Sequence, residues 1–186
     1  MINLILPFEG KWTVRNGGKE LASNNHLIEG RPKNQGLAYD FAINRDESNN
    51  LSDYPSYGKN VIAPCDGKVI QVISGAHDVA IGERDRSVGV GNAVMIQIDT
   101  STYAFLCHMM YESITVNVGQ EIKRGDLIGK CGNSGNSSQP HIHFHLQDSP
   151  EIYKGNPILP IFSKIKVNGI ILENAQAKRF DEVENI

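Results

Sequence analysis

A loop of small and polar residues leads directly into an alternating strand in the last third of the chain. Residues 132–140 read Gly-Asn-Ser-Gly-Asn-Ser-Ser-Gln-Pro, and residues 141–146 read His-Ile-His-Phe-His-Leu. Because successive side chains of a strand point to opposite faces, His141, His143 and His145 share one face. The apolar residues between them share the other face, which predicts a strand packed on a core.

The histidine face needs a separate explanation. Three imidazoles in a row are poor core material and are unusual on a solvated surface. Neutral imidazole is a common metal ligand and the usual proton carrier near neutral pH. The row therefore indicates a metal site or a proton-transfer site, and the alternative is a histidine-rich surface strand that binds nothing.

Length and charge limit the class of protein. The 186 residues are enough for one domain with a core, and 18 Lys and Arg nearly balance 21 Asp and Glu. A nucleic-acid-binding protein needs a basic excess, so that class is disfavoured. No apolar run is long enough to span a bilayer. Met1 to Pro7 lacks a basic start and a cleavage site, which favours a first strand over a signal peptide.

The cysteines do not indicate a structural framework. Cys65, Cys107 and Cys131 show no Cys-x-x-Cys spacing and cannot all pair within the chain, which disfavours a disulfide scaffold and a zinc knuckle. Each is expected to be a small buried hydrophobic residue. Cys107 precedes His108, but neighbours on a strand face opposite ways, which disfavours a Cys-His nucleophile pair.

Short strands separated by turn residues predict an antiparallel all-β fold. We expect a β-sandwich or a partly open barrel, with long loops forming a groove. The expected strands are two before residue 15, one at 37–43, an Asp-Gly hairpin at 61–73, a pair at 92–99 and 103–109, short strands in 116–130, the histidine strand, and an Asn-Gly hairpin in 161–172.

The remaining segments are predicted as polar loops at 15–36, 44–60 and 74–91, and as a short helix or frayed tail at 173–186. We expect a single domain overall. In it, residues 1–36 supply N-terminal strands and a groove loop, residues 37–172 form the core that carries the site, and residues 173–186 form the C-terminal tail.

One acidic residue stands in the middle of the strand predicted at 37–43. Alternation places Asp40 opposite Tyr39 and Phe41, on a face with two alanines that leave space around the carboxylate. A mid-strand Asp is disfavoured by propensity and costly to bury unless it is paired or bound to a metal. The alternative is an Asp on a solvated face.

Several motifs in one consistent order carry a family resemblance. Residues 132–144 are similar to a Gly-Asn-Thr-Gly loop followed by His-x-His, and 119–129 to a glycine-punctuated segment. Residues 61–69 match Val-x-Ala-Pro followed by Asp-Gly-x-Val, and 103–108 take the place of a Tyr-Ala-His strand. From residue 35 to 146 the chain thus resembles the LytM/lysostaphin-type zinc metallopeptidases, which cut peptide bonds in bacterial peptidoglycan.

The resemblance implies one Zn²⁺ per chain and a role for each matching residue. His143 and Asp40 correspond to metal ligands, and His141 and His108 to catalytic histidines that do not bind the metal. The common pattern has a further ligand, a His four residues before the Asp, where this chain has Gly36. We assign His26 as that ligand, on a longer loop ahead of the Gln-x-x-Ala-Tyr-Asp-Phe strand.

Other residues stay open as candidates. His145 stands where many family members carry Glu, and it is either a ligand or a residue supporting one. His77 is an alternative to His26. Tyr39 or Tyr103 could stabilise an oxyanion, although a buried core tyrosine is the commoner outcome.

The predicted function is a zinc-dependent metalloendopeptidase acting through zinc-activated water on peptidoglycan peptides or other peptide substrates. The alternative is an inactive family member serving as a cell-wall-binding or regulatory module, which Gly36 favours. Biotinyl and lipoyl carriers share glycine-punctuated strands, but no Met-Lys-Met-like site is present. The resemblance implies a secreted or cell-envelope location, although no signal peptide is visible. The sequence leaves the bond cut and the oligomeric state open.

Overall fold

The computed structural model describes residues 2–43 and 48–186, and strands dominate the described chain. Thirteen strands form an 11-stranded sheet and a two-stranded sheet, all ladders between strands being antiparallel. The strands are β1 (Lys11–Asn16), β2 (Tyr39–Ala42), β3 (Asn60–Ile62), β4 (Gly67–Ile73), β5 (Asn92–Gln97), β6 (Tyr103–Met109), β7 (Glu121–Ile122), β8 (Leu127–Lys130), β9 (Ile142–Gln147), β10 (Pro157–Ile158), β11 (Phe162–Val167), β12 (Ile170–Ala175) and β13 (Glu182–Asn185). The 3₁₀ turns are η1 (Asn25–Leu27), η2 (Lys33–Gln35) and η3 (Leu51–Asp53).

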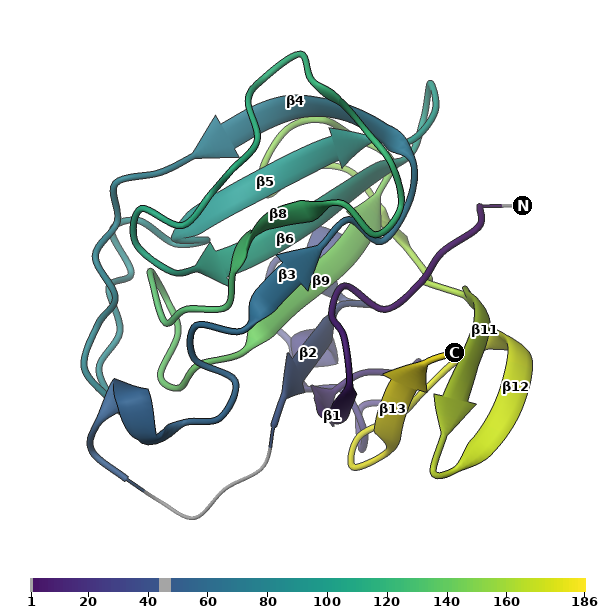
Figure 1. The fold of residues 1–186 in the computed structure, drawn as a ribbon, viewed down its shortest axis with the longest axis horizontal. Helices are drawn as coiled ribbons and strands as arrows, with labels where there is room; N and C mark the ends of the chain where they lie inside the picture. Colours follow the sequence, from purple (N-terminus) through teal and green to yellow (C-terminus); the bar gives the residue numbers. More distant parts are fainter. Residues whose placement is uncertain (1, 44–47) are drawn as a thin grey trace.

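The two sheets form two packed layers. The large sheet runs in the order β12-β11-β13-β1-β2-β9-β6-β5-β4-β7, with β10 on the edge of β9, and its two ends do not meet. The β3–β8 sheet lies across one face of it (Figure 1). Val61 and Ile128 of the small sheet belong to the same buried cluster as Leu106 and Phe144 of the large one. This open, antiparallel arrangement confirms the predicted all-β fold.

Strand β9 alternates as predicted. Ile142, Phe144 and Leu146 are buried in the main core. His143 and His145 point to the other face of the large sheet. That face has a smaller apolar cluster of its own, which includes Phe105 and Cys107 of β6. The functional side chains therefore lie on the side of the sheet that the β3–β8 layer does not cover.

The Asn-Gly signal predicts the β11–β12 hairpin correctly. Asn168 and Gly169 connect the two strands and have φ angles of 49° and 83°. Two consecutive positive φ angles define a turn whose twist matches that of the flanking strands, and Asn and Gly tolerate them best. The β5–β6 hairpin is likewise confirmed.

The hairpin predicted at 61–73 is wrong. Both strands exist, but β3 pairs with β8, whereas β4 pairs with β5 and β7. The Asp66 carboxylate accepts hydrogen bonds from the backbone of Arg124 and the amine of Lys123, at 2.8 and 3.1 Å. The Asp-Gly turn is thereby bound to a distant segment, and the chain crosses from one layer to the other instead of folding back.

The first strand predicted at residues 1–7 is also wrong for the described residues 2–7. Leu4 forms one isolated bridge with Phe162, and Ile5 donates a hydrogen bond to the carbonyl of Pro64. Leu4 and Leu6 are fully buried in the main core. Side-chain burial rather than a continuous ladder holds this segment against the molecule.

The C-terminal segment is a strand and not the predicted short helix or frayed tail. β13 lies between β1 and β11 in the large sheet. The Asn185 side chain also donates to the carbonyls of Leu6 and Phe8 and accepts from the Leu6 amide. Of the loop predicted at 44–60, residues 44–47 lie outside the described residues, and residues 48–59 contain only η3.

The burial of Val183 in β13 predicts how strongly its truncation lowers the free energy of unfolding. Val183 is fully buried, whereas Val118 is 63% exposed. We expect Val183→Ala to lower the free energy of unfolding by about 2 kcal/mol, because it removes buried methyl groups and leaves a cavity. Val118→Ala, the matched control, should change it by less than about 0.5 kcal/mol. Urea titration checks both, and equal effects would contradict the placement of β13 in the sheet.

Candidate active site

The pairing of β2 with β9 brings two predicted site residues together. Asp40 and His143 are cross-strand partners, and Tyr39 and Phe41 on either side of Asp40 are buried in the main core. The strand period therefore forces the Asp40 carboxylate to the face that carries the histidines. The alternative of an Asp on a solvated face is wrong, because Asp40 is buried.

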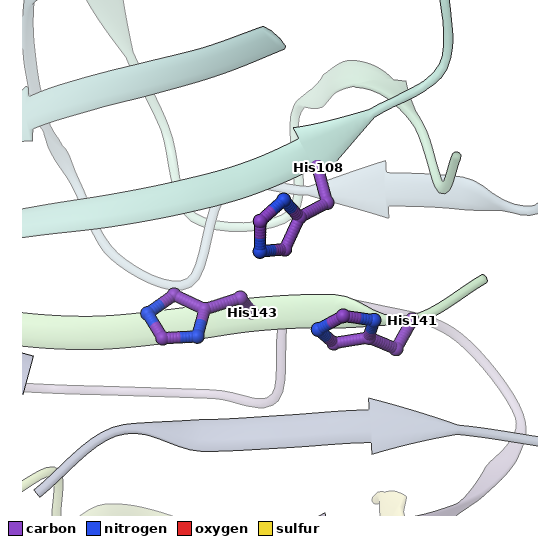
Figure 2. A group of neighbouring side chains, drawn as sticks. All are labelled: His108, His141 and His143. Carbon is purple, nitrogen blue, oxygen red and sulfur yellow. The ribbon is translucent and has the colours of Figure 1, made fainter. Parts of the chain in front are cut away.

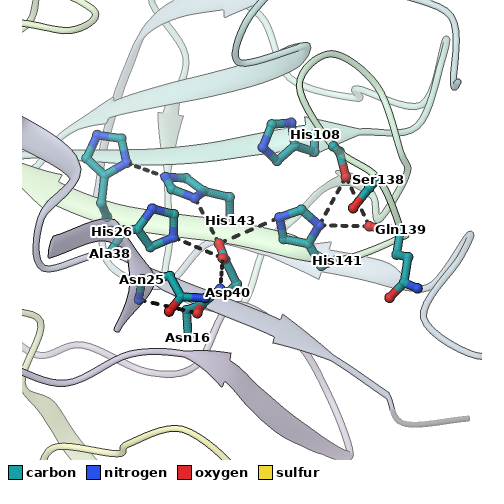
Figure 3. A network of polar contacts seen from close by, with 12 residues as sticks. Asn16, Asn25, His26, Ala38, Asp40, His108, Ser138, Gln139, His141 and His143 are labelled. Carbon is teal, nitrogen blue, oxygen red and sulfur yellow. Dashed lines mark hydrogen bonds and ion pairs between the residues drawn. The ribbon is translucent and has the colours of Figure 1, made fainter. Parts of the chain in front are cut away.

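Three donor groups from separate segments converge at this point. His26 Nε2 lies 2.9 Å from Asp40 Oδ2, and His143 Nδ1 lies 2.9 Å from Asp40 Oδ1 (Figure 3). One ligand atom from each of the three residues lies within 4.8 Å of the others. The Asn24 side chain accepts from the His26 amide and donates to the Gly36 carbonyl. This brings His26, on η1, to Asp40 and His143, although Gly36 stands at the position of the common ligand.

The donor set fits zinc. Two imidazole nitrogens and one carboxylate oxygen are a known catalytic combination, and three protein ligands leave a coordination position open. The neighbouring carboxylate also explains why buried polar groups are tolerated here, since a buried charge requires a partner of opposite sign.

Electrostatics keep Asp40 ionised. Burial opposes the charge of the carboxylate, but His26, His141 and the hydrogen bonds from His143 and His26 outweigh it and hold the pKa of Asp40 well below its usual value. Asn16 Nδ2 donates to Asp40 Oδ2 at 2.7 Å and helps to orient it. The carboxylate is thus available as a ligand at neutral pH.

His108 and His141 lie beside this group as neighbours, with their ring planes tilted by 47° (Figure 2). Their ring centroids are 4.9 Å apart. His108 Nδ1 donates to the Ser134 carbonyl and His141 Nδ1 to the Gln139 carbonyl, both at 2.8 Å. With the ring proton on Nδ1, a singly protonated ring keeps the lone pair of Nε2. His141 Nε2 lies 3.6 Å from Asp40 Oδ1.

His108 reaches the groove through its backbone conformation. Strict alternation along β6 would place it opposite Cys107, but His108 has a φ angle of 61°, and both residues line the same groove. Burial raises the pKa of the Cys107 thiol, which keeps the thiol protonated and unsuited to attack. Burial likewise lowers the pKa of His108 well below its usual value, so that its imidazole is neutral.

The structure contains a second possible donor group. His108, His141 and His143 also offer ligand atoms within 4.8 Å of one another. Both groups share His143, but only the group with Asp40 supplies a negative charge to balance a divalent cation in a buried position. That difference makes His26, Asp40 and His143 the better candidate ligands of the two groups.

The other candidates lie elsewhere. His145 is buried behind His143 and does not line the groove. His77 stacks on Tyr111 with ring centroids 4.1 Å apart, also outside the groove. The Tyr39 hydroxyl donates to the Ala177 carbonyl, and Tyr103 belongs to the small apolar cluster.

A groove of about 620 Å³ passes over the histidines. Among the described residues, its lining includes five arginines but only two acidic residues, Glu29 and Asp40. The arginines are Arg15, Arg31, Arg84, Arg86 and Arg179. Sequence reasoning missed them because they come from four separate segments of a chain with a net negative charge, so that only the fold assembles them.

An open β-sandwich with two imidazoles and a carboxylate at the floor of a groove defines a metallopeptidase-like architecture. Residues 52–160, more than half of the chain, match the model of peptidase family M23, and the chain belongs to this family. The match includes His108, His141 and His143, whereas His26 and Asp40 precede it. The predicted relation to LytM/lysostaphin-type peptidases is confirmed.

Individual relatives agree with this assignment. The chain is 29% identical over 99 residues to the peptidoglycan DD-endopeptidase ShyA of Vibrio cholerae, covering 50% of this chain and 21% of that protein. It is 26% identical over 134 residues to the glycyl-glycine endopeptidase ALE-1 of Staphylococcus capitis, covering 68% and 33%. A zinc-containing peptidase from Vibrio cholerae shares the fold, with a TM-score of 0.55 at 22% identity over 86% of this chain and 40% of that one.

The chain therefore spans a fifth to a third of the length of these curated relatives. Family M23 is zinc-dependent, and the His-Asp group of this chain matches that cofactor. No helix of the described residues is long and apolar enough to cross a membrane.

Proposed function

We propose that this chain is a zinc metalloendopeptidase that hydrolyses peptide bonds in bacterial peptidoglycan. The observation that carries the proposal is the convergence of His26 Nε2, Asp40 and His143 Nδ1 beside two further imidazoles in an open groove. Family membership and the names of the relatives support the choice of substrate.

His26, Asp40 and His143 would hold the metal. A zinc ion held there would supply Lewis-acid chemistry, polarising the scissile carbonyl and lowering the pKa of bound water towards about 7. The protein supplies the geometry, because the β2–β9 ladder sets Asp40 against His143, and Asn24 and Asn16 orient His26 and Asp40.

His108 and His141 transfer protons in this proposal. Each ring is anchored through Nδ1 to a backbone carbonyl, so its Nε2 is free to accept the proton of the attacking water. The ring that has accepted the proton becomes a donor. It then stabilises the developing oxyanion or delivers the proton to the leaving amine.

The inactive-module alternative depended on the missing histidine at Gly36. The 2.9 Å distance between His26 Nε2 and Asp40 Oδ2 supports His26 as a substitute for that histidine and weakens the argument for a lost site. We therefore favour the enzyme.

Digestion of purified cell walls tests the proposed function. Protein loaded with one zinc per chain should release new amino termini, a chelator should stop the release, and added zinc should restore it. Zinc-loaded protein that binds cell walls without releasing amino termini would favour the inactive module instead.

The arginines of the groove favour a substrate that carries carboxylates. Arg179 lines the groove, and its buried Nε finds no hydrogen-bond partner among the described residues. An arginine that lines a groove can bind a substrate carboxylate through a charge-assisted hydrogen bond of its guanidinium group. A neutral glycine chain offers no such group.

We expect Arg179→Gln to raise KM for a carboxylate-bearing peptide about tenfold, the loss of one charge-assisted hydrogen bond of about 1.5 kcal/mol. KM for a neutral glycine peptide should not change. Lys178→Gln, a charge change outside the groove, is the matched control. Equal effects of the two substitutions, or equal effects on the two peptides, would contradict a carboxylate subsite.

A further inference from the structure

A row of buried side-chain hydrogen bonds extends from the back of His143 along β9. His143 Nε2 lies 3.0 Å from His145 Nδ1, and His145 Nε2 lies 3.1 Å from Gln147 Oε1. The exposed fractions of the three residues are 3%, 1% and 0%. Since His145 and Gln147 do not line the groove, any influence on the reaction has to pass through His143.

The contacts of Gln147, the last residue of the row, determine which atom donates and which accepts in each hydrogen bond. Gln147 Nε2 lies 2.7 Å from the Ser149 carbonyl and 2.9 Å from the Glu151 carbonyl. Carbonyl oxygens only accept, so the amide nitrogen of Gln147 must face them and its Oε1 must face the other way. Asn34 Nδ2 also donates to this Oε1, at 2.6 Å.

The orientation of the Gln147 amide determines which nitrogen of His145, and then of His143, carries the ring proton. Because Gln147 Oε1 can only accept, His145 has to hold its proton on Nε2, and the Nδ1 of a neutral ring then has a lone pair. That Nδ1 accepts a proton from His143 Nε2. His143 is thereby left with a lone pair on Nδ1, the atom that lies 2.9 Å from Asp40 Oδ1. Two acceptors so close repel one another unless a proton or a metal ion lies between them.

Packing holds the ring of His145 in place. Phe105, its cross-strand partner on β6, stacks on it with ring centroids 4.6 Å apart and planes 12° apart. A ring stacked on one side and hydrogen-bonded at both nitrogens is not free to turn. The ring of His145 is therefore held in place, and each hydrogen bond of the row has only one possible donor and one possible acceptor.

We propose that His145 and Gln147 are positioning residues that select the nitrogen with which His143 binds the metal ion. By holding the proton of His143 on Nε2, they present Nδ1 to the ion with its lone pair already directed at it. This inference rests on the proposed metal site and adds to it the residues that prepare the ligand. It also explains why the alternating row of β9 continues to Gln147.

Ring ¹H–¹⁵N correlation spectra test this directly, independently of activity. In the zinc-loaded protein, His143 and His145 should both carry their ring proton on Nε2. In the metal-free protein, His145 should do so as well. A proton on Nδ1 of either ring in the zinc-loaded protein would overturn the proposal. Protein that binds no zinc would instead contradict the proposed function, and His145 in the metal-free spectrum would still decide the direction of the row.

Two substitutions extend the test. Gln147→Met has similar length but replaces the amide by a thioether, which donates no hydrogen bond and accepts only weakly. It should raise the zinc dissociation constant about 10- to 100-fold and mix the two ring forms of His145. His145→Gln can accept from His143 and donate to Gln147, and it should keep most of the zinc affinity. Met95→Leu, in the apolar cluster that contains Phe105, is the packing control. It should change neither the zinc affinity nor the ring protonation of His145. Unchanged zinc affinity and ring protonation in Gln147→Met would overturn the proposal.

Discussion

We expect His143→Ala to abolish zinc binding and peptide hydrolysis together. His143 belongs to both possible donor groups, and its Nδ1 lies 2.9 Å from Asp40. Without it, one imidazole and one carboxylate remain, too few to hold a catalytic zinc ion. Metal analysis of the purified variant should find about zero zinc per chain, against about one for the unmodified protein, and cell-wall digestion should fall to background.

The control for this variant is His77→Ala. It removes an imidazole that stacks on Tyr111 away from the groove, and it should leave zinc content and digestion unchanged. A His143→Ala protein that folds normally and still contains one zinc per chain would contradict the assigned site.

His141→Ala separates proton transfer from metal binding. We expect this variant to keep about one zinc per chain while kcat falls about 100- to 10,000-fold, the usual cost of losing a general acid or base. Its Nε2 faces the site but is not needed as a ligand when His26, Asp40 and His143 hold the metal. KM should change little, because the groove and its arginines remain.

The second possible ligand set predicts the opposite zinc content for the His141 and His26 variants. If His108, His141 and His143 bound the metal, His141→Ala would lose zinc, and His26→Ala would keep it. Measuring metal content and kcat on both variants therefore distinguishes the two ligand sets.

The shared face of the candidate site residues could be predicted where one strand encodes it. The period of two along residues 141–146 separates core side chains from functional ones without knowledge of the fold. Asp40 stood out because an acidic residue in an apolar strand is costly unless it has a partner. His26 could be assigned only through the family resemblance, because nothing local in residues 15–36 distinguishes it from another loop histidine.

The missed features depend on contacts between distant segments. The Asp-Gly turn at Asp66 predicts a hairpin locally, but its carboxylate binds the backbone of Arg124, and β3 pairs elsewhere. β13 is polar by composition, and it is a strand because its backbone pairs with β1 on one side and with β11 on the other. Gln147 was within reach of sequence reasoning, since it continues the histidine period by one step.

Anomalous diffraction at the zinc edge, from crystals of the zinc-loaded protein, tests the central claim most directly. The account predicts one peak, about 2.0–2.2 Å from His26 Nε2, an Asp40 oxygen and His143 Nδ1, with His108 and His141 outside bonding distance. A peak bound by His108 and His141 in place of His26 and Asp40, or no peak in this groove, would contradict it.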